Sequence, residues 1–142
     1  MDERIERSKL LYERALFEGD AGALEAAEFE LAVPVLWRSL ELATEADNTM
    51  TMSEALRHLG IAEHAAGRLE AAQLHLEEST RLRREMGAWP GVAANLVGLT
   101  YIAAGQDRRD DALKLIEEAS AIAEAGGAHG LLRQIEEARA QL

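Results

Sequence analysis

Apolar residues recur along the chain at intervals of three and four, the spacing that places side chains on one face of a helix. This pattern predicts three antiparallel helix pairs and a capping helix, all within one domain of residues 1–142. The pairs span about 3–46, 51–86 and 90–125, and the capping helix spans about 129–142. The predicted fold class is therefore all-α.

A signature of small, large and small residues at spacings of four and three occurs three times along the chain. The copies are Ala32–Leu36–Ser39, Ala72–Leu76–Ser79 and Ala112–Ile116–Ala119, so each follows the last by a 40-residue step. A step of this length is typical of repeat architectures. The small positions allow a neighbouring helix to approach closely, and the large position fills the space between them.

A second repetition has a 38-residue step, because LGIAEHAAG at 59–67 is echoed by VGLTYIAAG at 97–105. We expect Gly60 and Gly98 to lie at close helix contacts. Gly67 and Gly105 stand at the ends of the two phrases, and we expect them to end their helices, since glycine commonly terminates a helix.

Composition supports helices over sheets, because Ala and Leu dominate, aromatic residues make up 4% and there are only two prolines. The net charge of -11 argues against binding to nucleic acid or to an anionic membrane, since both favour basic surfaces. No stretch approaches the ~20 apolar residues needed to span a bilayer. The charged first residues contain no signal-peptide core, so we expect a cytoplasmic protein.

These residues together resemble the tetratricopeptide repeat family, in the longer form of about 40 residues found in bacterial regulatory proteins. The resemblance rests on Leu59–Gly60, Gly67, Ala72 and Leu76, and on their counterparts Gly98, Tyr101, Gly105, Ala112 and Ile116. Glu63 stands where the family has a tyrosine. The resemblance implies a right-handed superhelix that binds a peptide or helix of another protein, without catalysis.

In the family, the first helix of each pair lines a concave groove, and the 38-residue step carries those positions onto two stretches of this chain. The resemblance implies a partner-binding groove formed by Glu54, Arg57, Ile61, His64, Val92, Asn95, Leu99 and Ile102. Two occupants remain open besides a partner: the chain's own capping helix or a second copy of the chain.

Residues with catalytic or metal-binding chemistry form no motif. His58 and His64 are six positions apart and face different sides of a helix, and no HExxH or Glu-x-x-His pair accompanies them. The glutamates occur mostly as pairs on predicted outer faces, and no phosphate-binding glycine loop is present. We therefore expect no metal, no cofactor and no enzymatic activity.

The remaining conspicuous residues have ordinary structural interpretations. The arginine cluster at 81–84 suits the end of a helix, where the macrodipole favours cations. Trp37 is expected to pack inside the helix array. Trp89 precedes a helix that begins with Pro90, where it either stabilises the turn or anchors an interface. A homodimer and a peptide-sensing regulatory unit are the alternatives to an adaptor.

Overall fold

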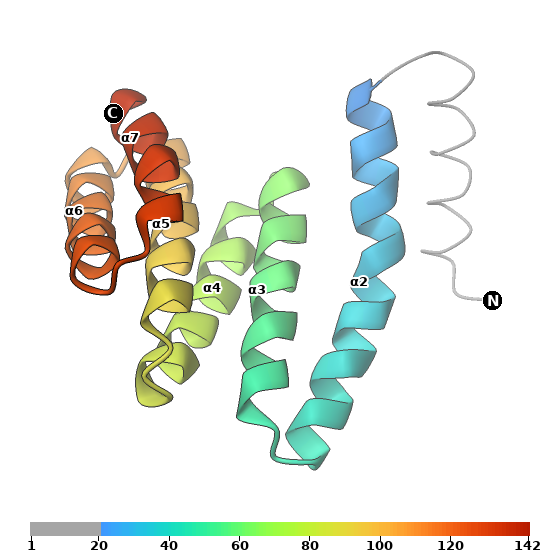
Figure 1. Cartoon of the computed structure of the whole chain (residues 1–142). Coiled ribbons are helices and arrows are strands. Elements are labelled where there is room, and N and C mark those ends of the chain that lie inside the picture. Colours follow the sequence, from blue (N-terminus) through green and yellow to red (C-terminus); the bar gives the residue numbers. More distant parts are fainter. Residues whose placement is uncertain (1–20) are drawn as a thin grey trace.

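The computed structural model describes residues 21–142, so the helix expected near residues 3–18 lies outside the described part. The described part is all-α, and its helices follow one another in a row of sequential antiparallel pairs (Figure 1). They are α2 (Ala21–Glu45), α3 (Thr49–Ala65), α4 (Leu69–Glu85), α5 (Trp89–Gly105), α6 (Arg109–Ala125), the 3-10 turn η1 (His129–Leu131) and α7 (Leu132–Ala140).

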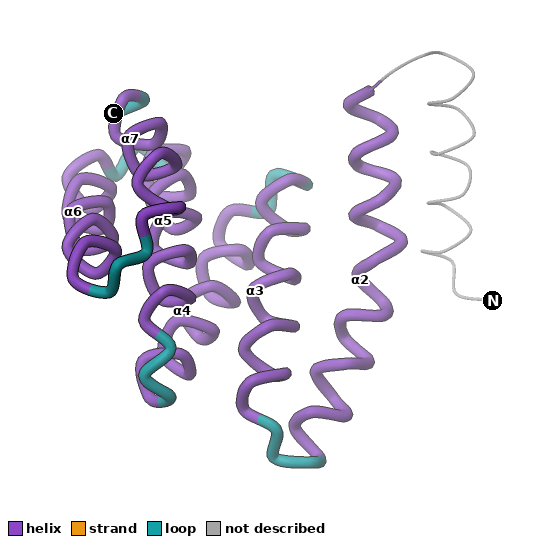
Figure 2. The backbone as a smooth tube through the Cα atoms, in the orientation of Figure 1, coloured by secondary structure: helices purple, strands orange, loops and turns teal. Residues whose placement is uncertain are grey.

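The four helices from α3 to α6 repeat at a regular step. Each has 17 residues, and they start at Thr49, Leu69, Trp89 and Arg109. Three-residue turns join them and appear as short loops between long helices (Figure 2). A helix and its turn therefore make a 20-residue unit, and a helix pair makes the 40-residue step of the small–large–small signature.

The turns share one backbone geometry. Five turns share it, from the turn between α2 and α3 to the turn between α6 and η1. In each, the second turn residue has positive φ, and the amide of the next residue donates to a carbonyl five positions earlier, as in Schellman helix ends. These donors bond at 2.8–2.9 Å, for example from Arg68 N to Glu63 O. The positive-φ residues are Asp47, Gly67, Gly87, Asp107 and Gly127. The prediction that Gly67 ends a helix is confirmed. Gly105 is the last residue of α5, as predicted, and the positive-φ residue of the following turn is Asp107.

The small–large–small signature marks the buried face. Ala72, Leu76 and Ser79 of α4 are at most 1% exposed, and their counterparts on α6, Ala112, Ile116 and Ala119, are fully buried. Ile135 and Ala138 of α7 belong to the same hydrophobic core, which extends across α4, α5, α6 and α7. The capping helix thus buries one face and leaves its other face polar.

Leu76 shows how glycines set the helix spacing. A Cβ added to Gly60 of α3 would lie 2.7 Å from Leu76 Cγ, and one added to Gly98 of α5 would lie 3.2 Å from Leu76 Cδ1. One leucine of α4 therefore inserts between two glycines, one on the helix before it and one on the helix after it. Both predicted close contacts are present.

Helix α2 continues through Pro34. The sequence suggests that this proline kinks the helix or delays its start, because proline lacks the amide donor that a helix interior uses. The helix begins at Ala21 and ends at Glu45 without interruption.

Candidate functional site

The predicted groove residues divide into two groups with different surroundings. On α3, Glu54 and His64 are exposed, and Arg57 and Ile61 are half-buried. On α5, the four predicted residues are 6% exposed or less; they are Val92, Asn95, Leu99 and Ile102. Val92, Asn95 and Ile102 are fully buried, which corrects the expectation that their side chains line an open surface.

The cause is a register difference of two positions. The glycine phrases repeat at a 38-residue step, from Gly60 to Gly98, whereas the helix starts follow a 40-residue step, from Thr49 to Trp89. Two positions correspond to about 200° around a helix, so the shorter step transfers side chains to nearly the opposite face. The 40-residue step carries Glu54, Ile61 and His64 to Ala94, Tyr101 and Ala104. All three are half-buried, and Tyr101 packs against the core. The same step carries Arg57 to Val97, which is 7% exposed and belongs to the core.

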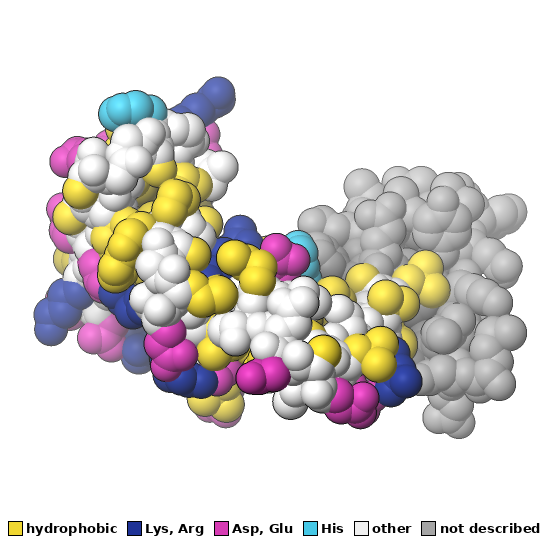
Figure 3. Space-filling view, turned by 60° about the horizontal axis from the view of Figure 1, so that its bottom comes forward, with side chains coloured by type: hydrophobic (Ala, Val, Ile, Leu, Met, Phe, Trp, Pro, Cys, Tyr) yellow, Lys and Arg dark blue, Asp and Glu magenta, His cyan; other side chains and the backbone are white. Residues whose placement is uncertain are grey.

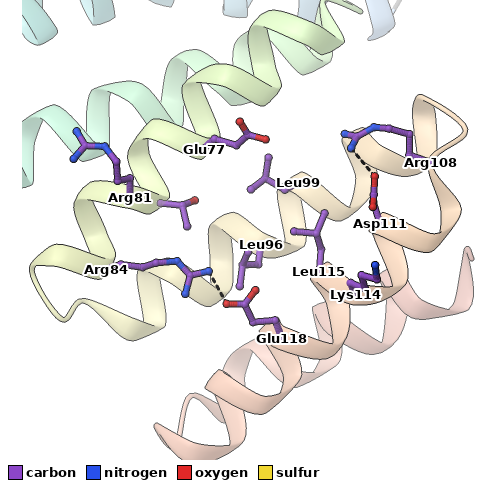
Figure 4. Close-up of a pocket in the computed structure, with 11 residues that line it drawn as sticks. Glu77, Arg81, Arg84, Leu96, Leu99, Arg108, Asp111, Lys114, Leu115 and Glu118 are labelled. Atoms are coloured by element: carbon purple, nitrogen blue, oxygen red, sulfur yellow. Dashed lines mark hydrogen bonds and ion pairs between the residues drawn. The ribbon is translucent and has the colours of Figure 1, made fainter.

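An open groove lies elsewhere, between α4 and α6 with α5 as its floor (Figure 4). Its volume is about 600 Å³. We call it the inter-helix groove. Its lining residues are Glu77, Thr80, Arg81 and Arg84 of α4, Leu96 and Leu99 of α5, Arg108 at the start of α6, and Asp111, Lys114, Leu115 and Glu118 of α6. Leu99 is the one predicted groove residue among them.

The inter-helix groove has an apolar centre. Leu96 and Leu99 project from α5, and Leu115 projects from α6 toward them (Figure 4). Leu96 and Leu99 are largely covered, at 2% and 6% exposure, because they also belong to the core. Half-buried Leu115 packs against the same core. The floor is consequently firm, with side chains held by packing on their inner sides.

Charged side chains of both signs form the walls. Arg84 of α4 reaches across to Glu118 of α6, with 2.6 Å between Nη2 and Oε1 (Figure 4). Arg108 pairs with Asp111 at 2.9 Å. Lys114 makes no ion pair with the residues that the structure describes. The lining residues therefore include four cations and three carboxylates, on a protein whose net charge is -11.

Arg81 is at the edge of the groove and turns away from its centre (Figure 4). It donates to Glu78 and Glu85 of its own helix. The hydrogen bond from Arg81 lowers the pKa of the Glu78 carboxyl, and this bond with the nearby negative charges raises the pKa of Arg81. Arg81 is therefore engaged within its own helix. Arg83 and Arg84 are the basic residues in the last turn of α4, and their side chains reach other helices.

A buried polar network joins α3, α4 and α5 next to the groove-facing part of α4. Fully buried Asn95 accepts from Arg57 Nη1 at 2.8 Å and donates to Ser79 Oγ at 2.9 Å. Ser79 Oγ donates in turn to the carbonyl oxygen of Ser53 at 2.7 Å. Asn95 thus has both ends of its amide satisfied, as a buried amide requires. The sequence suggested Asn95 as a binding residue, and the structure gives it a role in positioning Arg57.

Arg83 of α4 joins the same region. Its Nη1 donates to the carbonyl of Gly91 at 3.2 Å, and a Cβ on Gly91 would lie 2.8 Å from that nitrogen. Burial lowers the pKa of both Arg57 and Arg83, and the charge of Arg83 lowers that of Arg57 further. The negative charge of exposed Glu54 partly offsets this effect on Arg83, because it raises the pKa of that arginine.

The tryptophans lie at other places on the surface. Trp37 of α2 is 39% exposed, and its ring meets that of His75 edge-on at 5.4 Å between centroids. His75 Nδ1 lies 2.9 Å from an oxygen of buried Glu63. Trp37 is therefore an exposed side chain that contacts His75 of α4, and it does not pack inside the helix array as the sequence suggested. Trp89 is the first residue of α5 and is 46% exposed.

Figure 3 shows one face of the molecule, on which small groups of hydrophobic side chains are separated by charged side chains of both signs. Within residues 21–142, no group of three or more histidine, aspartate and glutamate side chains is arranged to hold a metal ion. No helix in this part of the chain is both long and apolar enough to cross a membrane.

Comparison with known proteins gives no match, whether with family models, curated proteins or solved structures.

Proposed function

We propose that this protein is a non-catalytic interaction module of the tetratricopeptide repeat type, which binds a peptide segment or a helix of a partner protein in the inter-helix groove. The observation that carries the proposal is the groove itself, with its floor of Leu96, Leu99 and Leu115 between two charged helices. Peptide-binding grooves combine apolar pockets with peripheral polar groups in this way.

The array of sequential helix pairs supports the family assignment, because stacked helix pairs of this kind form extended binding surfaces. The walls supply selectivity. Lys114, which makes no ion pair within the described part of the chain, offers a cation beside the apolar floor. The Arg84–Glu118 pair is exposed enough to exchange partners with an incoming chain. We therefore expect a partner segment with alternating apolar and acidic residues.

The test is selection of binding peptides from a random displayed library, followed by fluorescence anisotropy with purified peptides. Lys114→Glu should weaken binding about tenfold, corresponding to about 1.4 kcal/mol. Arg133→Glu makes the same charge change at a site 89% exposed on α7, outside the groove, and should leave affinity unchanged. Equal affinity for wild type and Lys114→Glu would show that the inter-helix groove is not the binding site.

Self-association is the second candidate, and it rests on Trp89, which presents 46% of its surface at the start of α5. Tryptophan is enriched among residues that dominate interfaces. Sedimentation velocity over a hundredfold concentration range tests it. A mass that stays at 15.5 kDa excludes a homodimer, and a mass that doubles in wild type but not in Trp89→Ala supports one.

A further inference from the structure

Most arginines in the described part of the chain are paired with carboxylates, but two half-buried ones are not. Six arginines form ion pairs: Arg38, Arg81, Arg84, Arg108, Arg133 and Arg139. Arg57 and Arg83 make no ion pair with any described carboxylate, although both lie partly inside the helix array. Placing cations out of water without a counter-charge is unfavourable.

The two guanidinium groups are held side by side at the junction of α3 and α5. Arg83 contacts Ser53 Oγ of α3 at 3.5 Å and Gly91 O of α5 at 3.2 Å. Arg57 belongs to α3, four positions after Ser53, and its bond to Asn95 lies four positions after Gly91 on α5. On both helices the contact of Arg57 therefore lies one turn beyond the contact of Arg83, and the two cations are near enough for the charge of Arg83 to act on Arg57.

The surroundings fix each group in place. Gly91 leaves room for Arg83 to lie against the backbone of α5, because a Cβ there would overlap the arginine side chain. Asn95 is itself anchored by Ser79, so its oxygen holds Arg57 in a set position. Arg57 uses one of its five N–H donors in these bonds and Arg83 uses two, which leaves several donors on each for another acceptor.

We propose that Arg57 and Arg83 form a binding site for an oxyanion, a carboxylate or phosphate group that bridges the two guanidinium ions. The site is distinct from the inter-helix groove, since neither arginine lines that groove. The two-pronged geometry of guanidinium suits an oxyanion with several acceptor atoms. The Glu54 carboxylate would compete with a bound oxyanion for Arg83, because its charge acts on that arginine although the two form no ion pair.

The primary test uses the wild-type protein labelled with ¹⁵N. The arginine Nε–Hε signals are followed during titration with sodium phosphate at constant ionic strength, with sodium chloride as the balancing salt. We expect the signals of Arg57 and Arg83 to shift together and to saturate at one dissociation constant, while those of Arg38 and Arg133 stay in place. A second titration with sodium acetate shows whether a carboxylate suffices or a phosphate is needed.

Substitutions then test whether phosphate binding depends on Arg57 and Arg83. Arg57→Gln and Arg83→Gln should each weaken phosphate binding about tenfold, as expected for the loss of a charge-assisted contact. Glu54→Gln removes the competing charge and should strengthen binding about twofold to threefold. Arg133→Gln is the matched surface control.

The wild-type titration decides the matter even where a variant fails to fold. If all arginine signals drift alike without saturation in both phosphate and acetate, or if none moves, Arg57 and Arg83 do not form an oxyanion site. That result would leave the proposal for the inter-helix groove untouched.

Discussion

Helices α3 and α5 have the same length and the same place in successive pairs, yet they meet different surroundings. Helix α3 carries exposed Glu54 and His64 on the face that α5 fills with Ala94 and Ala104. Helix α5 packs against α4, α6 and α7 and also touches α3. The buried faces nevertheless coincide, because Leu56 and Leu59 match Leu96 and Leu99 at the 40-residue step.

The comparison teaches that the position of a residue on its helix decides whether it is buried, and the neighbouring helices decide what chemistry it can hold. At the 40-residue step, Ala55 of α3 corresponds to Asn95 of α5, and both are buried. The alanine fills space, whereas the asparagine orients Arg57 across the helix junction. Equivalent positions on repeated helices are therefore buried alike, and a single polar residue such as Asn95 adds hydrogen bonds that the other repeat lacks.

The largest expected effect tests this register directly. Ile102→Ala should lower the free energy of unfolding by about 2–5 kcal/mol, because it empties a fully buried site. His64→Ala, the equivalent substitution under the 38-residue step, should change stability by less than about 0.5 kcal/mol because His64 is exposed. Urea denaturation followed by circular dichroism measures both. Similar losses in the two variants would contradict the 40-residue register.

Asn95→Ala gives α5 the residue that α3 has at the corresponding position. We expect a loss of about 1–3 kcal/mol, because Arg57 loses its acceptor and Ser79 loses a donor in a buried place. Asn95→Asp should cost less, since a carboxylate can still accept from Arg57. The same urea experiment applies, and an Asp variant less stable than the Ala variant would argue against a stabilising role for the bond to Arg57.

The two glycines beside Leu76 should respond with opposite signs. In Gly60→Ala, the new methyl group meets Leu76 Cγ and the Ala72 carbonyl oxygen, so overpacking should exceed the gain in helix propensity and cost about 1–2 kcal/mol. In Gly98→Ala the methyl group meets only the end of Leu76, which can shift. That variant should be neutral or more stable by up to about 1 kcal/mol. Thermal unfolding distinguishes the two, and a destabilised Gly98→Ala would show that α4 and α5 cannot adjust.

The smallest effect concerns the ion pair across the inter-helix groove. Arg84→Gln should reduce stability by about 0.2–1 kcal/mol, because both partners of the Arg84–Glu118 pair are partly exposed. The difference should shrink as sodium chloride rises, since salt screens exposed charges. Thermal unfolding at low and high salt measures it, with Arg133→Gln as the control. A salt-independent loss would indicate that packing of the Arg84 side chain matters more than its charge.

Much of the fold could be predicted from the sequence. The predicted helix pairs 51–86 and 90–125 begin and end within two positions of the observed ones, and the small–large–small signature identifies the buried faces of α4 and α6. The register of the groove could not be obtained from the glycine phrases, because Gly60 and Gly98 contact Leu76 from opposite sides rather than as equivalents.

A better signal was present in the turn residues, which recur at a 20-residue step from Asp47 to Gly127, as do Leu36, Leu56, Leu76, Leu96 and Ile116. The pairing of Arg57 with Arg83 could not be predicted in this way. Arg81, Arg83 and Arg84 are close in sequence, but their side chains reach α4 itself, the α3–α5 junction and α6, and only the tertiary structure separates them.

The uniform turn has a consequence for how such a chain can change in length. Because every turn between successive helices from α2 to α6 has the same three-residue form, joining Asn48 directly to Trp89 would remove one complete helix pair and leave every remaining helix at its original rotation. A 38-residue deletion would instead rotate everything downstream by about 200° and turn core residues outward. Duplication and loss of modules are therefore permitted only as whole helix pairs with their turns, and the turns fix the size of that unit.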